Sequence, residues 1–155
     1  MSRGFFVTLF AVAGVLAIVF LLPNTYDQAP TMKTGTVQFE NGVTVAVEVV
    51  DTAELQRQGL SGHKELTDDQ GMLFVFDDLI ARTFWMKDMT FAIDIIWIYD
   101  GRVVGIEKSM QPPAASDGTI YVASSPEPVD HVLEVAAGWS DRHGVQVGQG
   151  VDVID

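Results

Sequence analysis

The stretch TVQFENGVTVAVEVV, residues 36–50, decides the fold class of this chain. Alternating β-branched residues flank Asn41-Gly42, which is the strongest short hairpin signal because both positions of such a two-residue turn need φ > 0. The pattern predicts strands near residues 36–40 and 43–50. We therefore expect the folded domain to begin with a β-hairpin.

Short strands continue along the rest of the chain. Residues 72–76 (MLFVF) predict a buried strand by their length and aromatic content. Asp100-Gly101 predicts a second hairpin turn. Further strands are expected at residues 83–87, 94–99, 102–107, 131–135, 145–147 and 151–153, with a long loop at 109–128.

Only short helices are expected. Asp51 with Glu54 three residues later is typical of a helix N-terminus, and Gly59 ends that helix after about two turns. A second short helix is expected at residues 138–143, with Gly144 as its left-handed terminator. Helices this short and scattered do not fit a parallel βαβ fold. The fold class is therefore α+β and β-rich: a small antiparallel sandwich or distorted barrel with one or two short helices, plus one N-terminal transmembrane helix.

The segment before this domain is strongly apolar. From Gly4 to Leu22 the only polar side chain is that of Thr8, and a helix of these 19 residues spans a bilayer core of roughly 30 Å. A cleaved signal peptide has a shorter apolar run followed by small residues, whereas this run ends in the bulky FLLP of residues 20–23. We expect residues 4–22 to be an uncleaved membrane anchor; a cleaved signal and a buried core helix are the alternatives.

The chain divides into three predicted parts. Residues 1–22 are the anchor or signal, residues 23–34 are a linker with two prolines, and residues 35–155 are the β-rich globular domain. Arg3 precedes the apolar segment and Asp27 follows it, which by the positive-inside rule keeps the N-terminus in the cytoplasm. We expect a single-pass protein with its domain outside the cytoplasm, or a secreted or periplasmic protein if the segment is cleaved.

Charge and residue types exclude several functions. After residue 30 the chain has 20 acidic and 8 basic residues, and this net charge of −12 makes nucleic acid and anionic lipid headgroups poor partners. The absence of cysteine excludes thiol catalysis, disulfides and cysteine-based metal sites. His63, His131 and His143 lie in three different predicted elements without metal-ligand spacing. We expect no metal site and no cofactor.

Six short motifs occur in order from residue 57 onward. They are Arg57 with QGL (58–60), GMLFVF (71–76), FWMKDM (84–89), IDII (93–96), VLEV (132–135) with Gly138-Trp139, and GVQVG (144–148). Together they resemble domain-of-unknown-function family 192 over about residues 43–153. The resemblance implies a compact, mostly β fold, often behind a signal or anchor segment, and no established activity. The chain departs from the family pattern at Asp88-Met89, where members often have Asn-Thr, and at Ala92, where a proline is usual.

Three charged residues lie beside strongly apolar stretches: Arg57, Lys87 and Asp94. A buried carboxylate is costly without a partner, so we expect Asp94 to pair with Arg57 or Lys87. The pair either fixes the fold or belongs to a polar cluster that lines a ligand pocket.

Trp85, Trp97 and Trp139 are either core residues or, where exposed, platforms on which sugars or peptides stack. Core packing is the main expectation, because positions 85 and 97 are both surrounded by apolar residues. The candidate ligand-binding residues are Arg57, Trp85, Lys87, Asp94 and Trp139, and no catalytic residue is assigned.

These observations favour a non-enzymatic, membrane-tethered domain that binds a small molecule, a glycan or an envelope protein. One alternative is an envelope hydrolase that uses acidic residues, with Asp94 as the first candidate; another is a structural partner module of an envelope complex. A pocket with two carboxylates of perturbed pKa would favour the hydrolase. A pocket with aromatic walls and no such pair would favour binding, and a large exposed apolar patch would favour the partner module.

Overall fold

The computed structural model describes residues 32–114 and 118–154. The predicted anchor at residues 4–22 and nearly all of the linker lie outside this part. Residues 32–155 form a compact unit of their own. Within the described ranges, no helix is long and apolar enough to cross a membrane.

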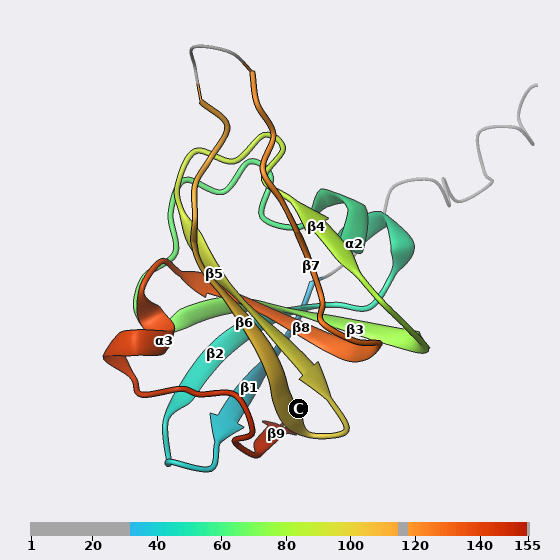
Figure 1. Cartoon of the computed structure of the whole chain (residues 1–155), viewed down its shortest axis with the longest axis vertical. Helices are drawn as coiled ribbons and strands as arrows, with labels where there is room; N and C mark the ends of the chain where they lie inside the picture. Colours follow the sequence, from blue (N-terminus) through green and yellow to red (C-terminus); the bar gives the residue numbers. More distant parts are fainter. Residues whose placement is uncertain (1–31, 115–117, 155) are drawn as a thin grey trace, which may run out of the picture. The chain divides into compact units, whose positions relative to one another are not determined.

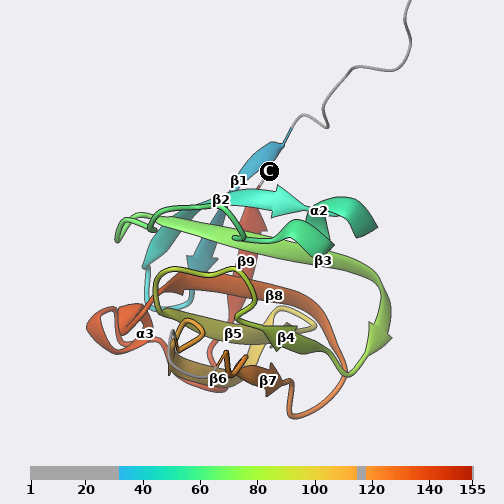
Figure 2. The ribbon, with the colours of Figure 1, turned by 90° about the horizontal axis from the view of Figure 1, so that it is seen from above.

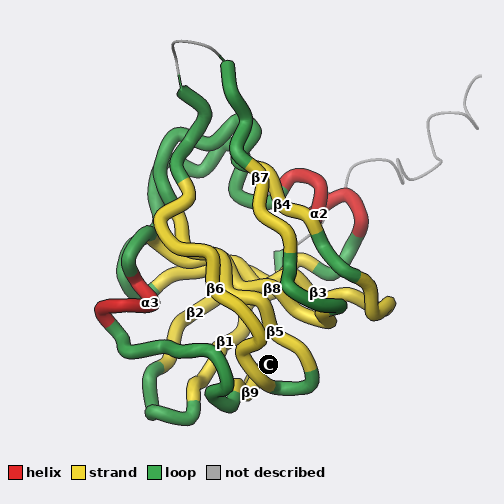
Figure 3. Tube along the Cα trace, in the orientation of Figure 1, coloured by secondary structure: helices red, strands yellow, loops and turns green. Residues whose placement is uncertain are grey.

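Nearly all the strands belong to one curled sheet (Figure 1; Figure 3). Its seven strands follow the order β6-β5-β8-β3-β2-β1-β9, and β4 and β7 form a separate two-stranded ribbon. The curl brings the two edge strands, β6 and β9, close together. Val103 N of β6 donates to Gln149 O, just before β9, at 3.0 Å. The elements are β1 (Lys33–Phe39), β2 (Thr44–Val50), α2 (Ala53–Gln58), β3 (Gln70–Ile80), β4 (Thr83–Trp85), β5 (Ile93–Tyr99), β6 (Arg102–Met110), β7 (Val122–Ser124), β8 (Val129–Ala136), α3 (Trp139–Arg142) and β9 (Val151–Ile154).

This architecture confirms the β-rich class with short helices, but one strand pair is not antiparallel. Strands β2 and β3 pair in parallel, with Val47 opposite Gly71. A parallel crossover needs a dozen or more residues. The segment 51–69, which contains α2, supplies them, so even a helix of 6 residues suffices. The prediction of a purely antiparallel sheet was therefore wrong at its centre.

The two predicted hairpin turns both form, with different geometry. At Asp100-Gly101 both residues have positive φ, 48° and 66°, as a two-residue turn requires. At Asn41-Gly42 only Gly42 does, with φ of 86°, and Phe39 N bonds Val43 O at 2.8 Å. The first hairpin therefore closes through a longer loop than predicted.

Local details also differ from the sequence expectation. Thr52, not Asp51, caps α2, because its Oγ1 accepts from Leu55 N. Residues 145–147 form no strand; Val145 instead turns back, its N–H bonding Ser140 O at 2.8 Å. The predicted loop 109–128 contains β7, which is only 3 residues long and too short to give a periodic signal.

Two apolar cores lie on the two faces of the sheet. One fills the inside of the curl, with Phe39, Leu133 and Trp139 among its members. The other covers the outer face, where Leu55 of α2 and Ala123 of β7 pack on sheet residues. Strands β3, β8 and β5 run side by side through the middle of the molecule (Figure 2) and contribute to both cores. Burial on both faces explains the apolar runs at residues 72–76 of β3 and 95–98 of β5, whereas β8 also contains Asp130, His131 and Glu134.

Candidate functional site

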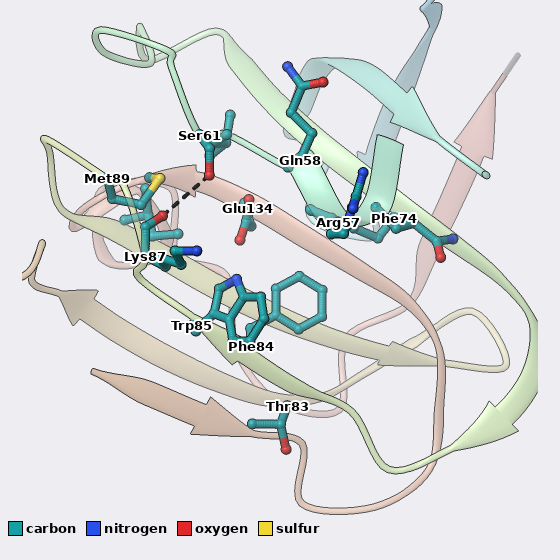
Figure 4. A pocket seen from close by; sticks show the side chains of 14 residues that line it. Arg57, Gln58, Ser61, Phe74, Thr83, Phe84, Trp85, Lys87, Met89 and Glu134 are labelled. Carbon is teal, nitrogen blue, oxygen red and sulfur yellow. Dashed lines mark hydrogen bonds between the residues drawn. The ribbon is translucent and has the colours of Figure 1, made fainter. Parts of the chain in front are cut away.

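A cavity of about 160 Å³ opens on the outer face of the sheet (Figure 4). Helix α2 and the residues after it form one wall, the β4 segment forms the other, and β8 contributes to the floor. The lining residues are Gln56, Arg57, Gln58, Gly59, Leu60, Ser61, Phe74, Thr83, Phe84, Trp85, Lys87, Met89, Ile93 and Glu134.

The helical wall is fixed to the sheet at several points. Leu55 is buried in the outer core, and the Gln56 side-chain amide donates to Val75 O at 2.6 Å. Gly59 ends the helix with φ of 50°, a conformation that favours glycine. A Cβ at this position would lie 3.3 Å from the Phe74 ring, so a glycine also lets the chain pass close to β3.

The opposite wall is aromatic. Phe84 points toward the sheet. Its ring forms T-shaped contacts with the rings of Phe74 and Trp97, at centroid distances of 4.7 and 5.5 Å. Trp85, the next residue, is 58% exposed and lines the cavity. The hydroxyl of Ser61 donates to Lys87 O at 3.3 Å and so joins the two walls (Figure 4).

Glu134 provides a carboxyl group at the floor. It is 6% exposed, and its Oε2 atom has no hydrogen-bond partner within the described residues. Its register neighbours on β3 and β5 are the apolar Met72 and Ile95. Burial raises the pKa of Glu134 to about 8, so the group is mostly protonated at pH 7. An unpaired buried polar group costs roughly 1–3 kcal/mol. A bound ligand that hydrogen-bonds to Glu134 Oε2 would remove this cost.

Three of the five candidate residues from the sequence meet at this cavity: Arg57, Trp85 and Lys87. Both cations lie on the exposed rim. The nearest carboxylate to Arg57 is that of Glu54 at 3.7 Å, and both side chains are largely exposed. Lys87 forms no ion pair within the described part of the chain.

Asp94 does not line the cavity, and the ion pair expected for it is wrong. The residue is fully buried, and its partners are backbone N–H groups: Oδ1 accepts from Ser109 at 2.8 Å and Gly138 at 2.9 Å, and Oδ2 from Ser140 at 3.0 Å. Such amides compensate a buried carboxylate as a cation would. Asp94 therefore anchors the start of α3 to the sheet.

Trp139 lies in the core inside the curl and also does not line the cavity. It is fully buried, its ring centroid is 5.7 Å from that of Phe39, and its Nε1 donates to Asp68 O at 2.7 Å. Trp97 is 2% exposed, as the core expectation required. Trp85 is 58% exposed, so the core expectation was wrong for this residue.

Sequence reasoning missed Glu134, although it lies in the VLEV motif. The available signal was the one applied to Asp94: an acid flanked on both sides by apolar residues, here Leu133 and Val135. No group of three or more histidine, cysteine or acidic side chains could hold a metal ion within residues 32–114 and 118–154. The chemistry of the cavity is therefore that of one neutral acid, two cations and an aromatic wall.

Comparisons with known proteins place the chain in a family. The profile of DUF192, described as Uncharacterized ACR, matches residues 36–153, so the chain belongs to this family and the resemblance is confirmed. No curated protein matches the chain. A crystal structure from Sinorhizobium meliloti, described as a "putative transcription regulator", is 27% identical with a TM-score of 0.72; the match covers 81% of this chain and 98% of that one. A protein of unknown function from Novosphingobium aromaticivorans is 29% identical with a TM-score of 0.65, covering 81% and 91% of the two chains.

Proposed function

We propose that this member of the uncharacterised family is a binding domain whose cavity between α2 and β4 holds one small ring-shaped molecule. The observation that carries the proposal is the buried Glu134 carboxyl, which lines the cavity and whose Oε2 has no hydrogen-bond partner among the described residues. Small-molecule sites typically combine apolar walls with a few polar groups that fix the ligand's orientation. Phe84 and Trp85 supply such a wall, and Glu134 such a group.

The size of the cavity supports a ligand of one ring. A cavity of about 150 Å³ can hold a benzene molecule, and this one measures about 160 Å³. The exposed face of Trp85 offers a surface on which a ring stacks. A protonated Glu134 both donates and accepts a hydrogen bond, so it can meet a hydroxyl or carbonyl oxygen of the ligand.

The hydrolase alternative has less support. Glycoside hydrolysis takes a pair of carboxyl groups on either side of the scissile bond. Glu134 is the one acid among the described residues that line the cavity. Asp94, the first candidate, has both carboxylate oxygens engaged by backbone N–H groups away from the cavity. We therefore favour binding over hydrolysis.

The partner-module alternative rests on exposed apolar side chains next to the cavity. Val122 lies opposite Trp85 in the β4–β7 ribbon and is 63% exposed, and its neighbours Ile120 and Tyr121 are also exposed. A protein partner that covers this ribbon would also cover the cavity mouth. Competition between such a partner and a small ligand would identify this second function.

We further propose that the domain works outside the cytoplasm, tethered through residues 4–22. The apolar run and the charges around it support this placement. A net charge of −12 opposes binding to DNA, so transcription regulation, the description that the Sinorhizobium protein carries, has less support here.

The proposal is tested by a ligand screen on residues 32–155. Residues 32–155 form a compact unit of their own, and the Sinorhizobium match covers 98% of that solved chain, so we expect this part to fold alone. Single-ring sugars and aromatic acids at millimolar concentration should raise the melting temperature if one binds, by mass action. Trp85→Ala should abolish the shift, whereas Tyr99→Ala, which changes an exposed aromatic residue outside the cavity, should keep it. If no ring compound shifts the wild-type domain, the cavity is not a binding site for such molecules.

A further inference from the structure

We propose that the cavity selects an acidic monosaccharide, whose carboxylate lies between Arg57 and Lys87 while its hydroxyl groups meet Glu134. This inference rests on the proposed function and adds the chemical class of the ligand. It follows from how the few cations of this acidic domain are distributed.

Most basic side chains of the domain are already paired. Lys33 contacts Asp51 at 2.6 Å, Lys108 contacts Asp141 at 2.5 Å and Arg142 contacts Asp68 at 2.7 Å. Arg82 pairs with Asp78, and Arg102 donates to Gly148 O at 3.2 Å.

Within the described residues Lys64, Lys87 and Arg102 have no ion pair, and of these Lys87 lines the cavity. Within the described residues Lys87 has no carboxylate partner, and the closest to Arg57 is 3.7 Å away. In a chain where acids outnumber bases 21 to 9, two cations at one cavity mouth mark a place for an anion, since Lys87 has no ion pair within the described residues and Arg57 has only a long, exposed one with Glu54. A carboxylate between them would form charge-assisted hydrogen bonds, which are stronger than neutral ones.

The Glu134 carboxyl at the floor of the cavity is compatible with an anionic ligand only because this carboxyl is protonated and therefore neutral. An ionised carboxylate there would repel a bound acid, but a protonated one donates a hydrogen bond to it or to its hydroxyls. The same rim cations disfavour an amine, which an ionised Glu134 would otherwise attract. The arrangement therefore selects against cationic ligands.

Polar groups in the cavity favour a sugar over an aromatic acid. Gln58, Ser61 and Thr83 line it together with Glu134, and each can bond a hydroxyl. A benzene ring would leave the Glu134 carboxyl without a partner, at the cost that any unpaired buried group carries. A pyranose acid satisfies the carboxyl and still presents a ring face to Trp85.

The experiment is isothermal titration of residues 32–155 with D-glucuronate, D-glucose and benzoate at pH 6.5. Glucuronate should bind at least about tenfold more tightly than the other two, since one or two charge-assisted bonds are at stake. Lys87→Gln and Arg57→Gln should each weaken glucuronate binding about tenfold and leave glucose unchanged. Lys64→Gln is the matched control, because it removes an exposed lysine that does not line the cavity; it should keep the wild-type affinity.

The outcomes separate this inference from the proposed function. Equal binding of glucose and glucuronate overturns selection for an acid and leaves a ring-binding cavity in place. Benzoate binding as tightly as glucuronate overturns the sugar class. An equal loss of affinity in Lys64→Gln and Lys87→Gln overturns the rim contact, because only the general charge of the domain would then matter. If none of the three binds at about 10 mM, a concentration that reveals even millimolar affinity, selection for an acidic sugar fails, and the wider thermal-shift screen decides the proposed function.

Discussion

Replacing Glu134 by glutamine should remove most of the alkaline loss of stability of the domain. Burial raises the pKa of Glu134 to about 8 in the folded state, against an ordinary value of 4.5. Below pH 4.5 the group is protonated in both states. Between pH 4.5 and 8 the unfolded chain releases the proton and the folded chain keeps it, so the free energy of unfolding falls as the pH rises.

The size of this loss follows from the two pKa values. They differ by 3.5, and each unit corresponds to 1.36 kcal/mol, so the full loss above pH 8 is about 5 kcal/mol. Roughly 4 kcal/mol of it falls between pH 5 and pH 9. A domain of this size is stable by about 5–15 kcal/mol, so the effect is a large part of the total. Glu134→Gln is close in shape and does not titrate, so it lacks this slope.

The assay is urea unfolding of wild type and Glu134→Gln at one-unit steps from pH 5 to pH 9. All other ionisable groups are the same in both proteins, so their contributions cancel in the difference. The two should be similar at pH 5, and the variant should be more stable at pH 9 by about 4 kcal/mol. Parallel pH profiles would refute the assignment of a buried, unpaired carboxyl at position 134.

Four further outcomes are expected. Glucuronate affinity should fall above pH 8 in wild type but not in Glu134→Gln, measured by titration at pH 6.5 and 9, because only the wild-type floor becomes an anion. Asp94→Asn should destabilise the domain by about 2–4 kcal/mol in urea, since its amide cannot accept all three backbone N–H bonds; exposed Asp88→Asn should have little effect. The hydrogen bonds from Arg142 and then His143 hold the pKa of Asp68 below 3.8, so acid unfolding should be steeper below pH 3.8 in wild type than in Asp68→Asn, as circular dichroism can show. Gly59→Ala should cost about 1–2 kcal/mol and more than Gly62→Ala, because both have positive φ but only Gly59 has the Phe74 ring in the way of a Cβ.

Local features of the fold were predictable from the sequence, and long-range ones were not. The turn at Asp100-Gly101 depends on the φ preferences of two neighbouring residues, and it formed as expected. The parallel pairing of β2 with β3 depends on where the chain returns to the sheet after the connecting segment 51–69. No local sequence pattern predicts that position. Strand β7 escaped detection for the same reason, since its 3 residues are ordered by β4 across the ribbon.

The candidate site shows the same limit. The sequence indicates that a buried acid needs a hydrogen-bond or charge partner, but it does not indicate which group of the fold supplies that partner. Asp94 and Glu134 lie near each other on paired strands, Asp94 opposite Val135 and Glu134 opposite Ile95. Alternation along the strands turns them to opposite faces of the sheet. On the inner face, backbone N–H groups at the start of α3 satisfy Asp94. On the outer face, a cavity remains above Glu134 and its Oε2 is unpaired. A buried acid needs a partner at both positions, although the ion pair expected for Asp94 was wrong and Glu134 was missed. Within the described residues Glu134 Oε2 has no such partner, and Glu134 is therefore the residue that points to a ligand.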